Sequence, residues 1–245
     1  MGELLGTVAF PLFVAVSLFL GVRLLVLASR TRRLPEFAIG VNFLSAGAIG
    51  YSLLIAAESL RVLGPYAGLG SFAGVTAISI GAFTIALFSQ RVFRPKSRAS
   101  RAALIAIGVW LALGVAGSWS LHVRRETAGV GVWLGHWAPN LGMLLAYAWS
   151  SAEPSRYAAL MRRRERHGLG DARIANRMLL WGVGTGAIAA VAALHLVAQL
   201  FGHYELPPSL LGVVSSLVLV TAFTEWLAFF PPRIYRRRFA TPVSD

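Results

Sequence analysis

The sequence contains no cysteine and a single lysine, and only 13% of its 245 residues are charged. The lack of cysteine excludes disulfides, thiolate metal ligands and a cysteine nucleophile. The low charge content accompanies 56% hydrophobic residues and a mean hydropathy of +0.66. That is more apolar surface than a soluble domain of this length buries. The composition therefore predicts an all-α integral membrane protein.

Long apolar runs recur along the whole chain, separated by short polar connections. About 20 apolar residues in a helix cross the roughly 30 Å of bilayer hydrocarbon. The runs are apolar on all sides and about twice as long as the strands of a transmembrane barrel, so they predict helices. Glu3 precedes the first run and the basic residues follow it, the reverse of a signal peptide, so this run is predicted to be an uncleaved span. Seven spans forming one bundle domain are expected, at residues 4–28, 37–59, 71–90, 102–121, 130–149, 178–201 and 209–230.

The basic residues gather on alternate connections. Of the 23 Lys and Arg residues, 19 lie between spans 1 and 2, 3 and 4, and 5 and 6, and in the tail after span 7. By the positive-inside rule, the N-terminus is predicted outside and the C-terminus in the cytoplasm. A multi-pass protein of a prokaryotic inner membrane is expected. These basic residues lie in short loops, so the predicted partner is anionic lipid at the cytoplasmic face and not nucleic acid. A cytoplasmic protein partner that docks at residues 150–177 is the alternative.

Short matches at a nearly constant offset indicate an internal repeat. Gly47-Ala48-Ile49 recurs as Gly186-Ala187-Ile188, and two further matches pair spans 2 and 3 with spans 6 and 7. They favour a 3+1+3 plan, in which two three-helix units flank a linker helix. Coincidence is the alternative in so apolar a chain.

The predicted topology resembles several known families, but none of their functional residues is present. The 3+1+3 plan resembles the SWEET-type sugar transporters, without their proline tetrads. The seven-helix plan with an external N-terminus resembles opsins and G-protein-coupled receptors, but Lys96 lies in a loop and cannot carry retinal in helix 7. The stretch 184–188 resembles the serine turn of rhomboid proteases with Thr185 in the nucleophile position. The sequence therefore predicts no enzymatic activity.

Two ionisable residues fall inside predicted spans at similar depth. Arg23 and Glu225 each lie about five residues before the cytoplasmic end of their span, roughly 7–8 Å inside the boundary. The first and last helices of a closed ring are neighbours, so a direct ion pair is expected. Arg23 reaching the interface alone is the alternative.

Polar side chains also gather in the outer half of the predicted bundle. Histidines in such a set could bind a divalent metal, hold haem or respond to pH, although no two of them have the i, i+4 spacing of a helical metal site. Ordinary interfacial hydrogen bonding is the alternative. The metal candidates are His122, His136, His195 and His203. The candidates for lining a ligand cavity are His136, Trp137, Asn140, His195, Gln199 and Glu58.

Two functions are compatible with these features. The first is a transporter-like protein that binds or passes a small or apolar ligand. The alternative is a seven-helix sensor or receptor that signals through the basic connection between spans 5 and 6 to a separate partner. No cofactor is required by either function, with divalent metal or haem as the only candidates.

Overall fold

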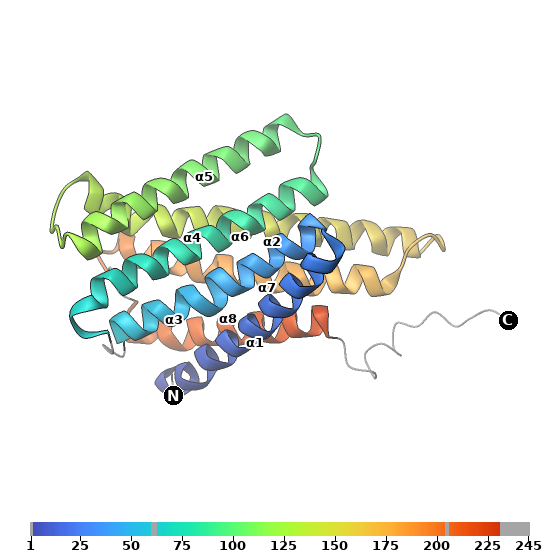
Figure 1. Cartoon of the computed structure of the whole chain (residues 1–245). Helices are drawn as coiled ribbons and strands as arrows, with labels where there is room; N and C mark the ends of the chain where they lie inside the picture. The colour runs from blue at the N-terminus through green and yellow to red at the C-terminus, as the bar shows by residue number, and fades with distance from the viewer. Residues whose placement is uncertain (1, 60–62, 204–205, 231–245) are drawn as a thin grey trace.

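The structure is a computed structural model that describes residues 2–59, 63–203 and 206–230. Every regular element in these ranges is helical, as predicted (Figure 1). The elements are α1 (Gly2–Thr31), α2 (Leu34–Asn42), the π-helix η1 (Phe43–Gly50), α3 (Tyr51–Leu54), the π-helix η2 (Ile55–Ser59), the 3₁₀-helix η3 (Gly64–Tyr66), α4 (Ala67–Phe93), α5 (Arg98–Ser118), the π-helix η4 (Trp119–Val123), α6 (Val130–Glu165), α7 (Ala172–Leu200) and α8 (Pro208–Phe229).

Six helices in the described part of the chain are long and apolar enough to cross a membrane. They correspond to predicted spans 1 to 4, 6 and 7, so the chain is a multi-pass helical membrane protein. The fifth predicted span forms the first part of α6, which has the length but not the apolar composition. Its polar residues are compatible with a central position, because α6 packs against α4, α5 and α7.

The helices are arranged so that most chain neighbours are also neighbours in space. α1 packs against α2 and α8, α4 against η1 and α6, and α7 against α6 and α8. The predicted contact between the first and last helices is therefore confirmed. Among the long helices, α5 packs mainly on α4 and α6, and it lies at the edge of the bundle (Figure 1).

The arginine-rich connections lie together at one end of the bundle. The α1–α2, α4–α5 and α6–α7 connections are found at that end in Figure 1, and the chain begins at the opposite end. α6 is 36 residues long, about 54 Å at 1.5 Å per residue, and it extends with α7 beyond the other helices. The helix continues through the basic run at residues 162–166. Asp171 begins α7 by accepting a hydrogen bond from the Arg173 amide, 2.8 Å away.

Glycines allow close contact between α5 and α6. A Cβ atom added to Gly117 would lie 2.6 Å from the Gly131 carbonyl oxygen and 2.7 Å from the Leu134 carbonyl carbon. A Cβ atom on Gly135 would lie 2.7 Å from the Gly117 carbonyl oxygen. Such backbone contact strengthens helix association in lipid, where no hydrophobic force joins helices.

Buried hydroxyl groups join α4, α6 and α7. The Ser89 and Ser150 hydroxyls lie 2.8 Å apart, and both residues are fully buried. Thr185 donates to the Ser150 carbonyl at 3.2 Å, and Ser151 donates to the Gly182 carbonyl at 2.6 Å. Each bond satisfies a polar group that would be costly to leave unpaired in an apolar interior.

Candidate functional site

The second span is interrupted by a π-helical segment at the centre of the bundle. The chain is α-helical to Asn42, becomes π-helical in η1, and is α-helical again from Tyr51. π-Helical turns are rare and occur frequently at functional sites. The flanking residues Asn42 and Tyr51, together with Phe43, Ala46 and Gly47 of η1, line one interior cavity.

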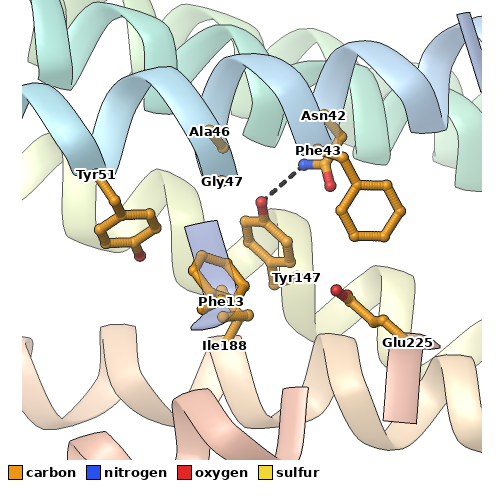
Figure 2. Close-up of a pocket in the computed structure, with 9 residues that line it drawn as sticks. All are labelled: Phe13, Asn42, Phe43, Ala46, Gly47, Tyr51, Tyr147, Ile188 and Glu225. Carbon is orange, nitrogen blue, oxygen red and sulfur yellow. Dashed lines mark hydrogen bonds between the residues drawn. The ribbon is translucent and has the colours of Figure 1, made fainter. Parts of the chain in front are cut away.

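This cavity lies where α1, η1, α6, α7 and α8 meet (Figure 2). It offers about 10 Å³ to the centre of a water molecule. That volume is close to the minimum for one ordered water. The remaining lining residues are Phe13, Tyr147, Ile188 and Glu225.

A hydrogen bond between α2 and α6 fixes the polar wall of the cavity. The Asn42 side-chain amide donates to the Gly81 carbonyl at 2.9 Å and to the Tyr147 hydroxyl at 2.7 Å. These two bonds use both hydrogens of the amide. Tyr147 therefore accepts from Asn42, and its own hydroxyl hydrogen remains available to another acceptor.

Among the described residues that line this cavity, Glu225 is the one with a carboxyl group. Its side chain reaches from α8 into the interior and is 4% exposed. Its Oε2 atom is buried and has no hydrogen-bond partner among the residues that the structure describes. The close approach of α7 helps to place it, because a Cβ atom added to Gly184 would lie 3.0 Å from the Glu225 Cγ. Nearby, the fully buried Ser17 hydroxyl also has no partner and lies against Gly47.

The predicted ion pair between Arg23 and Glu225 is not formed. In the described part of the chain the ion pairs are Arg94–Glu153, Arg124–Glu126 and Arg156–Glu153.

The two side chains lie on different sides of the helix pair. Arg23 is exposed, and its Cζ lies 4.2 Å from the centre of the Phe230 ring, a cation–π contact. Glu225 points inward instead. The two helices are neighbours, as predicted, but position along a helix does not determine which way each side chain faces.

Three of the predicted cavity residues meet at one backbone carbonyl in the α6–α7 contact. The His136 carbonyl accepts from the Gln199 amide at 3.0 Å and from the Asn140 amide at 3.2 Å. The Gln199 Oε1 atom is buried without a partner. Trp137 stacks on Trp133, with ring centroids 6.4 Å apart. These residues do not line the Glu225 cavity.

The other outer candidates are dispersed. His195 forms a 2.9 Å hydrogen bond from Nδ1 to the Val191 carbonyl of its own helix, and His203 is exposed after α7. The backbone of Glu58 is in η2, but its side chain lies outside the part that the structure describes. Among described residues, no three histidine or carboxylate side chains are close enough together to hold a metal ion. The predicted site built on His122, His136, His195 and His203 is therefore not assembled in the described part of the chain.

Sequence reasoning missed two of the cavity's polar groups, Asn42 and Tyr147. Both were visible as polar residues inside predicted spans, a signal that marks candidate sites in membrane proteins. The candidates inside the spans were the charged residues and the polar residues of the outer half, whereas Asn42 and Tyr147 lie in the inner half of their predicted spans. Tyr147 was also masked by the aromatic residues around it, which are typical of membrane interfaces.

The fold and its interior carboxyl group define a multi-pass helical membrane protein with a small interior cavity that a few polar groups help to line. No protein family, curated protein or solved structure matches the chain. The function of this chain is therefore inferred from its site alone.

Proposed function

We propose that the chain is a seven-helix membrane protein of the transporter class that binds and passes protons, with Glu225 as the proton-binding group. The observation that carries this proposal is the buried, unpartnered Glu225 Oε2 beside a cavity of about 10 Å³. Ionisable residues inside a membrane bundle commonly mark ion or proton pathways.

Charge and size together favour a proton over a larger ligand. A buried carboxylate without a cationic partner costs several kcal/mol, so Glu225 is stable there when a positive species neutralises it. The cavity has room for about one water molecule, which carries a proton as hydronium. A sugar or an apolar ligand needs a pocket of some 300 Å³ or more.

The polar groups near Glu225 also support a proton as the species that is bound and passed. Asn42 donates to the Tyr147 hydroxyl, which holds that hydroxyl in place and leaves its own hydrogen free to donate (Figure 2). A hydroxyl that can accept and donate at once is suited to pass a proton between a water molecule and a carboxyl group. The π-helical η1, beside this group, provides a segment of helix that can rearrange.

The bundle supports the proposed seven-helix topology with the N-terminus outside and the C-terminus in the cytoplasm. α6 is long enough to be the remaining span, and its neighbours shield its polar residues. The edge position of α5 fits a linker between two three-helix units, as a 3+1+3 plan requires.

Proton flux into vesicles tests the proposal. The purified protein is reconstituted into vesicles that enclose a pH-sensitive dye, and a potassium gradient with valinomycin makes the interior negative. Wild type should acidify the interior faster than empty vesicles. Glu225→Gln removes the ionisable group at almost constant volume and should reduce the protein-dependent rate at least tenfold, while Glu225→Asp should retain part of it.

Glu126→Gln is the matched control, because this carboxylate lies in the connection before α6, where it pairs with Arg124 at 3.4 Å. It should conduct at the wild-type rate. Melting curves identify variants that fail to fold. Wild-type vesicles no faster than empty ones, or undiminished flux through folded Glu225→Gln, would contradict the proposal. Sodium flux in place of proton flux would contradict the choice of ion.

A sensor is the second candidate, favoured by the extension of α6 and α7 beyond the bundle. This hairpin carries the basic run at residues 162–166 and is joined to α8 where the Arg177 Nε donates to the Ala228 carbonyl at 2.8 Å. In a sensor, a change at Glu225 would reach the hairpin. Glu225→Gln should then alter amide hydrogen exchange across residues 156–172, whereas in a simple proton conductor this region should exchange as in wild type.

A further inference from the structure

A second hollow lies on the outside of the bundle, at its arginine-rich end. It is a groove of about 590 Å³ between α5, α6 and the connection from α4 to α5. That volume is in the range of pockets that hold drug-sized ligands. The groove shares no residue with the Glu225 cavity.

The groove changes from polar to apolar along its length. On the α5 side, the lining extends from the N-cap residue Ser97 at the basic end to Ile107, ten residues or about 15 Å farther along the helix. α6 runs in the opposite direction, from Leu145 to Arg156. Because the helices are antiparallel, both place their polar lining at the basic end and their apolar lining deeper.

The polar end carries excess positive charge. The Arg94 Nε donates to both oxygens of Glu153, at 3.1 and 3.2 Å, and the Arg156 Nη1 lies 3.8 Å from the same carboxylate. Two arginines around one carboxylate leave a net charge of about +1. The Arg94 and Arg156 side chains are 49% and 67% exposed, so this charge is accessible at the mouth of the groove.

The apolar end is hollow because α5 presents small side chains there. Ala103 and Ala106 are exposed on α5, and they face a wall formed by Leu145 and Trp149 of α6. Trp149 lies between the apolar and polar ends, where tryptophan typically sits at a membrane interface. An acyl chain is the occupant that matches a wall of this kind in a bilayer.

We infer that this groove binds an anionic phospholipid, with its phosphate at Arg94 and Arg156 and an acyl chain along Ala103 and Leu145. The positive end attracts the headgroup, since each arginine near an anionic membrane surface strengthens binding about fivefold. The apolar end lies at the depth of the lipid chains. This binding site is independent of the proton pathway proposed above.

Native mass spectrometry of the full-length protein, released from detergent, tests the inference with phosphatidylglycerol and phosphatidylcholine as probes. Wild type should retain phosphatidylglycerol several-fold better than phosphatidylcholine. Replacing Arg94 and Arg156 by glutamine should weaken retention of phosphatidylglycerol about fivefold for each arginine. Ala103→Phe keeps every charge and fills the apolar end, so it should weaken retention of both lipids.

Two matched controls complete the test. Ala102→Phe adds the same ring to an exposed neighbour outside the groove, and Arg163→Gln removes a distant charge. Both should bind lipid as wild type does. Equal losses in controls and groove variants would overturn the site. Displacement of the lipid by millimolar inorganic phosphate would show that the groove is an anion site only. A change in oligomeric mass with Ala103→Phe would show that another protein chain occupies it. Either result would overturn the inference.

Discussion

Replacing Gly117 by alanine should weaken the bundle by a predictable amount. The added Cβ would lie 2.6 Å from the Gly131 carbonyl oxygen and 2.7 Å from the Leu134 carbonyl carbon. Both are backbone atoms of α6, so no side-chain rotation can relieve the contact. Overpacking costs about 1–3 kcal/mol, and a rigid contact belongs near the upper end of that range. Alanine gains about 1 kcal/mol over glycine as a helix former, so the expected net loss is about 2 kcal/mol.

The measurement is the free energy of unfolding in mixed micelles, from denaturant titration followed by circular dichroism. Gly108→Ala is the control on the same helix, because its Cβ would lie 3.0 Å from the Cε2 of Phe83, a partly exposed ring that can move. Its free energy of unfolding should equal that of wild type or exceed it by up to about 1 kcal/mol, because alanine is the better helix former. A Gly117→Ala protein as stable as wild type, or an equal loss in Gly108→Ala, would refute the backbone contact between α5 and α6.

Three further predictions concern single contacts and topology. Tyr147→Phe removes the acceptor of the Asn42 amide and should lower the free energy of unfolding by about 1 kcal/mol, in the same titration; no loss would mean that the bond is not formed. Glu153→Gln should cost about 1 kcal/mol or less because both partner arginines are half exposed, and a loss that persists in high salt would contradict an electrostatic cause. A reporter inserted at residues 166–171 should be cytoplasmic and one at 124–129 external, and the reverse result would overturn the orientation.

The predicted ion pair failed because helix position does not predict which way a side chain faces. Helix length and hydropathy placed Arg23 and Glu225 near the ends of the first and last helices, and the contact between α1 and α8 confirms that these two helices are neighbours. Rotation of a helix about its axis is set by side-chain packing, which no local pattern along one span reveals. Here Arg23 faces outward over Phe230, and Glu225 faces the interior. The Glu225 carboxyl group, which was expected in an ion pair, instead lines the interior cavity of the candidate site.

The outer polar residues show a related limit. Sequence proximity to one end of the bundle suggested a common site, and His136, Asn140 and Gln199 do meet. They meet through a backbone carbonyl that the two amides share. The sequence could not indicate this contact, because side-chain identity says nothing about which carbonyl a neighbouring helix presents.

By itself, the sequence determined the helical membrane fold and the position of nearly every span, because apolar length and a sparse charge content are local quantities. It also placed the basic connections, which the structure gathers at one end of the bundle. Only the tertiary structure decided that Asn42, Tyr147 and Glu225, from three distant helices, share one cavity of about 10 Å³. Such a site depends on the rotation and close approach of helices, and these are fixed by packing across the whole bundle.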